Sequence, residues 1–148
     1  MMKKYVALTI SLGLTALVFS FSMSSGSESS SLSSSIVVPI HQTLIRIFPD
    51  WTLTVDQLHL WVRKGAHVVE YAVLGVSWFV TLKWMNWPLI WFVLLGLAIA
   101  IIDETIQLFS LDRGSSVIDV LLYDMPGFLL GGLIAHRVLM IEMKRNAP

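Results

Sequence analysis

Four long apolar stretches, separated by polar segments, dominate the 148-residue chain, at about residues 5–22, 64–82, 87–103 and 117–139. Each has roughly the 17–25 residues that a helix needs to cross a lipid bilayer. Hydrophobic residues make up 55% of the chain and charged residues only 14%, a balance typical of integral membrane proteins. The pattern predicts an all-α membrane protein, a four-span transmembrane helical bundle that forms a single domain over residues 1–148.

The first apolar stretch has two interpretations. Ser20-Phe21-Ser22 offers the small residues of a signal-peptide cleavage site. The stretch is also just long enough to remain as a first span. We favour a retained span, because the later stretches also look like spans.

The segment between the first two spans changes character halfway. Residues 22–35 are rich in serine and carry too little apolar surface to pack, so they predict an outer loop. Residues 36–48 place apolar side chains at helical spacing opposite His41 and Arg46, which predicts a short amphipathic helix. That helix either lies in the headgroup layer or forms a lid packed on the bundle.

Local signals mark where the other helices begin. Thr54 and Gln57 have the spacing of a capping box, so the second long helix is predicted to run from near Val55 to about Leu82. Ser115 or Ser116 can cap the last span, which also contains a set of small residues suited to close helix packing: Gly127, Gly131 and Ala135. Pro126 predicts a kink in that span.

The short basic loops predict a topology. With the N-terminus inside, four spans place these basic residues on the cytoplasmic side: Lys3, Lys4, Lys83, Lys144 and Arg145. This arrangement agrees with the positive-inside rule. We therefore expect a multi-pass protein of the cell membrane with both termini in the cytoplasm.

Ionisable residues within the spans are the strongest functional signal. If Gly65 marks the lipid boundary, Glu70 lies about 8 Å inside it. The outer ends of the last three predicted spans carry His67, Glu70, Asp103, Glu104, Gln107, Arg113, Ser115, Ser116, Asp119 and Asp124. Charge at such depth is costly without partners, so these residues predict a water-accessible polar pocket at the outer leaflet.

Several chemistries fit this set. His67 beside Glu70 could act as a general base oriented by a carboxylate, assisted by Asp103, Glu104 and Asp119. An anionic group could be bound by Arg63, Lys64, Tyr71, Gln107, Arg113, Ser115 and Ser116. The same carboxylates and His67 could ligate a divalent metal, but their spacing is a weak metal signal, so we expect no cofactor. Alternatively, Arg63 and Lys64 are interface anchors and Glu70 pairs with a neighbour only to hold the bundle.

The motifs also resemble a known family. Arg63-Lys-x-x-His67-x-x-Glu70-Tyr71, then Asp103-Glu104-x-x-Gln107, then Arg113, Asp119, Asp124, Gly127 and Gly131 are similar, in the same order, to the VanZ-like membrane proteins. The match covers roughly residues 57–132. The resemblance implies a small multi-span bacterial membrane protein of the kind associated with reduced sensitivity to teicoplanin.

The chain departs from the family pattern in places. Ile106 stands where members often have histidine, and Leu111-Asp112 replaces a proline-glycine pair. Tyr123 looks like one extra residue between Asp119 and Asp124. Five residues turn a straight helix by about 140°, so both carboxylates can face one pocket only if the helix is distorted.

These observations favour a protein that binds, or also chemically processes, an anionic membrane lipid or a lipid-linked cell-envelope component. The alternative is a non-enzymatic module that binds lipoglycopeptides or envelope partners, and a small transporter is less favoured because no repeated half is visible. A neutral net charge without a basic patch excludes nucleic acid as a partner. The sequence predicts no particular oligomeric state.

Overall fold

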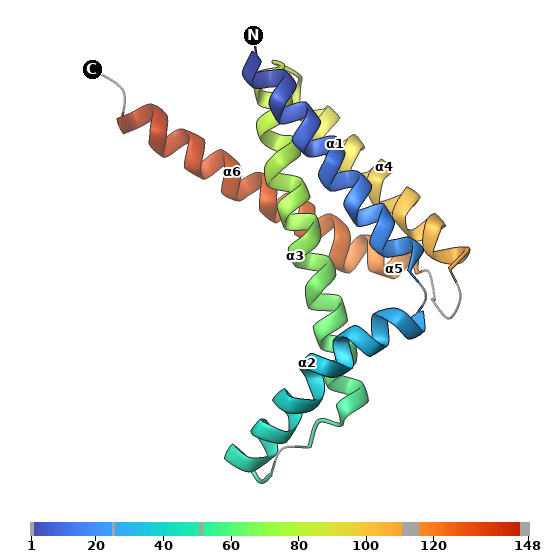
Figure 1. Ribbon diagram of the computed structural model, residues 1–148. Coiled ribbons are helices and arrows are strands. Elements are labelled where there is room, and N and C mark those ends of the chain that lie inside the picture. The colour runs from blue at the N-terminus through green and yellow to red at the C-terminus, as the bar shows by residue number, and fades with distance from the viewer. Residues whose placement is uncertain (1, 25, 51, 111–115, 146–148) are drawn as a thin grey trace.

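The computed structural model describes residues 2–24, 26–50, 52–110 and 116–145 (Figure 1). Its elements are α1 (Met2–Met23), α2 (Gly26–Ile47), α3 (Val55–Trp84), α4 (Leu89–Leu108), α5 (Val117–Asp119), the π-helix η1 (Val120–Asp124) and α6 (Met125–Arg145). Four segments are long and apolar enough to cross a membrane: α1, α3, α4 and the continuous run α5–η1–α6. The predicted all-α bundle with four potential spans is confirmed.

The beginning of α3 is fixed locally, as its sequence indicates. The backbone N–H of Gln57 donates to Thr54 Oγ1 over 3.3 Å, and the backbone N–H of Thr54 donates to Gln57 Oε1 over 2.9 Å. This reciprocal capping box satisfies two N–H groups that a helix start otherwise leaves free. At the other end, Asn86 takes a left-handed φ of 57° in the short turn to α4.

Helices α3 and α6 cross with their backbones in contact. A Cβ atom at Gly131 would overlap the carbonyl oxygen of Ala72, and one at Gly75 would overlap the carbonyl of Phe128. Ala135, one turn beyond Gly131, is buried as well. Small residues allow such an approach where lipid provides no hydrophobic drive for helices to associate. Beyond this crossing, α6 diverges from the other helices (Figure 1).

Helix α1 is joined to α3 by hydroxyl groups within the apolar zone. The Ser11 hydroxyl lies 2.7 Å from that of Ser77 and 2.9 Å from that of Thr81. One turn further along α1, Trp78 Nε1 donates to Thr15 Oγ1 over 3.0 Å. Hydrogen bonds between side chains are a usual means of joining helices in lipid.

The structure corrects the prediction for residues 22–35. Instead of a loop followed by a separate helix at 36–48, the backbone forms one helix, α2, from Gly26 to Ile47. Helix α2 packs on α3, where Ser34 Oγ lies 3.2 Å from His59 Nε2, and His41 Nε2 lies 2.8 Å from the Leu53 carbonyl oxygen just before α3. These contacts compensate for the low helix preference of the serines. The amphipathic stretch is therefore helical and packs on α3, while several of its apolar side chains, among them Ile36, Ile40 and Ile47, are exposed.

The last apolar segment is not regular. Residues Val120–Asp124 form a π-helix, and the Met125 amide donates to the carbonyl of Val120, five residues earlier. The extra residue that the sequence suggested near Tyr123 therefore corresponds to a wider helical turn. Pro126 has no N–H to donate to the carbonyl of Leu122, which lies within this wide turn, so the distortion expected from the proline is present as a π-helix. Such π segments are rare and frequently lie at functional sites.

Candidate functional site

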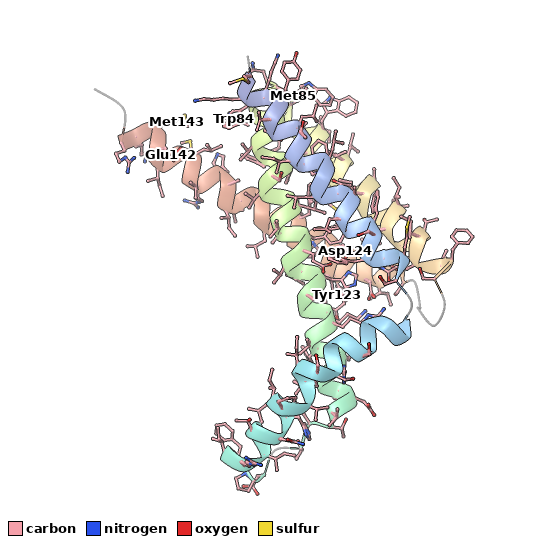
Figure 2. All side chains as sticks on the ribbon, viewed as in Figure 1. Trp84, Met85, Tyr123, Asp124, Glu142 and Met143 are labelled. Carbon is pink, nitrogen blue, oxygen red and sulfur yellow. The ribbon has the colours of Figure 1, made fainter. Side chains whose placement is uncertain are left out.

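The centre of the candidate site is a pair between α3 and η1. His67 Nδ1 lies 3.3 Å from Asp124 Oδ1, although the two residues are 57 positions apart. The Asp124 side chain is fully buried, while 13% of the His67 side chain is exposed. Figure 2 shows Asp124 beside α3, away from the end of the molecule where Trp84 lies. A buried carboxylate thus holds a partly exposed imidazole.

The π-helix allows both aspartates of the last span to face α3. Lys64, one turn before His67, forms an ion pair with Asp119. The same ammonium group lies 4.9 Å from the centre of the Tyr123 ring, within cation–π range. Because η1 is wound more widely than an α-helix, Asp119 and Asp124 contact successive turns of α3. The helix distortion that Asp119 and Asp124 need in order to face the same site is therefore present.

Helix α4 contributes a second, deeper group of side chains. Asp103 and Gln107 are buried, and Gln107 Nε2 donates to Asp103 Oδ2 over 3.3 Å and to Ser22 Oγ over 3.5 Å. The Ser110 hydroxyl donates to the Ser22 carbonyl over 2.7 Å. Ser22, at the end of α1, was not predicted as a site residue. It lies at the start of a serine-rich tract, where its sequence context gives no sign that it is buried.

Glu104 connects α4 to the beginning of the last span. Its Oε2 accepts a hydrogen bond of 2.7 Å from the Ser116 amide. Ser116 in turn caps α5, since its hydroxyl accepts from the Ile118 amide over 3.2 Å. Ser115 and Arg113 lie outside the described residues.

Among the buried oxygens of this region, Asp124 Oδ2 has no hydrogen-bond partner in the described part of the chain, while Tyr71 and Asp103 lie within hydrogen-bonding reach of each other. Tyr71 interacts electrostatically with both carboxylates, and the two carboxylates interact with each other. Unsatisfied buried polar groups cost about 1–3 kcal/mol each, so a protein rarely retains them without a use. Within the described part of the chain, no group of three or more His, Asp or Glu residues is placed to hold a metal ion.

The other predicted site residues have distinct positions. Glu70 is partly buried on α3 and interacts electrostatically with His67, but the hydrogen-bond partner of His67 is Asp124. Arg63 is partly buried and forms no ion pair with any residue that the structure describes. We expected an open pocket, whereas Asp103, Glu104 and Asp124 are buried between helices. Lys64, His67 and Asp119 form the partly exposed rim of this cluster.

Four helices that are apolar and long enough to span a membrane, packed around buried ionisable side chains, define a polytopic helical membrane protein. The chain matches the VanZ/LLP1 family model over residues 6–140, nearly its whole length. It therefore belongs to the VanZ/LLP1 family, as its motifs indicated. No curated protein and no solved structure matches the chain.

Proposed function

We propose that this VanZ/LLP1-family protein binds the anionic head of a membrane lipid or lipid-linked envelope component and acts on it by acid–base chemistry. The observation that carries the proposal is the contact between His67 Nδ1 and the fully buried Asp124. An ionised Asp124 accepts a hydrogen bond from Nδ1–H and leaves Nε2 as the basic nitrogen. Asp124 thereby takes the orienting role that the sequence suggested for Glu70.

The rim of the cluster supports an anionic ligand. Lys64 and Arg63 lie within one helical turn of His67, and both are partly buried. Lys64 is balanced by Asp119, so an incoming phosphate or carboxylate would replace one anionic partner by another. This exchange avoids leaving a bare ammonium group near lipid, which would be costly.

The deeper residues supply a place for the proton. Tyr71, Asp103 and Asp124 are buried together, Tyr71 lies within hydrogen-bonding reach of Asp103, and Asp124 Oδ2 has no hydrogen-bond partner in the described structure. A proton taken up by His67 can be stabilised by this set of carboxylates. The geometry thus favours a reaction that moves a proton at the headgroup.

The test uses purified protein in vesicles made from an envelope lipid extract, with the lipids analysed by mass spectrometry. We expect the wild type to convert a lipid species and His67→Gln or Asp124→Asn to slow this by about 10²–10⁴-fold, the usual contribution of a general base. His59→Gln is the matched control, because His59 is on the same helix but contacts Ser34 of α2. Equal conversion by wild type and His67→Gln would disprove the acid–base role.

A binding module is the second candidate. It is favoured by the ion pair of Lys64 with Asp119 and by the position of Lys64 over Tyr123, which close the rim of the cluster. Saturable binding of a lipid-linked component, without any product and with loss in Lys64→Met, would select this candidate. In cells, either activity is expected to lower sensitivity to teicoplanin, and Asp124→Asn is expected to remove that effect.

The proposal also needs the cluster to face outward. We infer that both termini are cytoplasmic, since the short loops carry their lysines on that side. A reporter fused after Pro148 that is active only in the cytoplasm would support this orientation. If the reporter is active only outside the cell, the polar cluster faces the cytoplasm and the substrate is bound at that face of the membrane.

A further inference from the structure

The end of the molecule opposite the polar cluster contains an apolar groove where α6 diverges from α3 and α4. The groove has a volume of about 510 Å³, within the range of ~300–1,000 Å³ typical of ligand pockets. Phe79 of α3, Phe92 of α4 and Leu133 of α6 line its sides. Lys83, in the last turn of α3, and Trp87, in the turn to α4, also line the groove.

Lys83 also lines a second hollow, of about 350 Å³, together with Lys3 and Lys4. Neither lining includes a carboxylate, and none of these three lysines forms an ion pair with a residue that the structure describes. Lys83 therefore lines both the apolar groove and a neighbouring cationic hollow that has no carboxylate in its lining. Figure 2 shows Trp84 and Met85 at this end of the bundle, remote from Asp124.

The start of α4 adds to the positive character of this end. Pro88, its N-cap residue, makes no side-chain hydrogen bond to the helix, so no side chain at that position caps the first amide groups. A helix N-terminus carries a partial positive charge and favours anions. Trp84 and Trp87 are the residue type that lies at the level of lipid headgroups.

We propose that this groove is a binding site for an anionic phospholipid, with an acyl chain in the groove and the phosphate on Lys3, Lys4 and Lys83. The apolar lining matches the chain, and the uncompensated lysines match the headgroup charge. This site is separate from the polar cluster, and its occupancy does not depend on the proposed chemistry there. Its ligand is held at the lysine-rich end, whereas the proposed substrate is held at the other.

The experiment measures retained lipid by native mass spectrometry of the full chain extracted from vesicles with equal amounts of phosphatidylglycerol and phosphatidylcholine. We expect phosphatidylglycerol to be retained preferentially. Each lysine near a lipid surface contributes about a fivefold preference, so Lys83→Gln should lower it about fivefold and the triple Lys3, Lys4 and Lys83 change to Gln should abolish it. Leu133→Trp, which fills the groove from α6, should lower retention of both lipids.

The matched control is the double variant Lys144→Gln with Arg145→Gln, which removes charge from the end of α6, away from the groove. It should leave the preference unchanged. Circular dichroism and gel filtration establish that each variant is folded. The proposal is overturned if the wild type shows no preference, if the control variant loses as much as the triple variant, or if inorganic phosphate displaces the phospholipid completely.

Discussion

The two ends of this molecule handle charge in opposite ways. At one end, ionisable side chains from α3, α4 and η1 lie inside the bundle, where Lys64 forms an ion pair with Asp119 and His67 contacts Asp124. At the other end, Lys3, Lys4 and Lys83 lie at the surface without carboxylate partners in the described structure. Charge in a membrane must either pair inside the protein or reach the interface. One chain uses both solutions, and only the buried one requires a defined fold.

This difference predicts where mutations are costly. The buried end depends on helix register, because each polar group needs a partner from another segment. The lysine-rich end depends mainly on being exposed at the membrane surface. The following predictions test that contrast.

The largest effect is expected from shifting the register of α4. Deletion of Ala98, an exposed residue, turns the following part of the helix by about 100° relative to the part before it. Asp103 and Glu104 would then leave their partners, at a cost of about 2.5–3.5 kcal/mol for a carboxylate facing lipid. We expect loss of the folded protein in gel filtration and thermal unfolding.

Deletion of Leu121 is the comparison for this variant. Leu121 is an exposed residue of the π-helix η1, so its removal can turn the wide turn into an ordinary α-helical one. Asp119 and Asp124 would then be four residues apart and still on one face. A folded protein with unfolding close to wild type is expected. An equal loss of stability in both deletion variants would mean that η1 does not result from one inserted residue.

The next largest loss of stability is expected at the crossing of α3 and α6, which lies between the two ends of the molecule. In Gly131→Val, the new side chain would meet the Ala72 backbone, so the helices must separate. Overpacking of this kind costs about 1–3 kcal/mol or more. Thermal unfolding in detergent should show the loss. Gly13→Val is the control, because a Cβ at Gly13 meets nothing within 4 Å, and an equal loss there would argue against the crossing.

Gln107→Ala compares the two ends directly. Gln107 is buried and donates to Asp103 and Ser22, so its truncation removes one donor from each and should cost about 1–3 kcal/mol. Lys83→Ala, at the exposed end, should change stability by no more than about 0.5 kcal/mol. Chemical denaturation of both variants measures the difference. Equal costs would contradict the contrast between a buried and a surface arrangement.

Much of the fold could be predicted because its signals are local. Apolar length defines the four long helices, and Thr54 with Gln57 defines the start of α3. The serine-rich tract was predicted wrongly, since α2 packs along α3 and that contact is not visible in a local pattern. Tertiary packing commonly overrides weak helix preference.

The residues of the candidate site could be predicted from the sequence, but not which of them contact each other. The polar residues of three spans were recognised from the cost of charge in lipid. The choice of Asp124 over Glu70 as hydrogen-bond partner of His67 depends on the π-helix, for which the sequence offered only one extra residue. Ser22 was missed because its burial follows from how α1 docks against α4.

The smallest predicted effect lies between the two ends, where α1 joins α3. Ser11→Ala removes the hydroxyl that contacts Ser77 and Thr81, and such a bond within a membrane is worth about 0.6 kcal/mol on average. Ser20→Ala is the matched control, because the exposed Ser20 hydroxyl donates to the Leu17 carbonyl of its own helix. A small, reproducible drop in the unfolding midpoint for Ser11→Ala alone is expected. If α1 were removed as a signal peptide, neither substitution would change the mature protein, and the intact mass would show the loss of the segment.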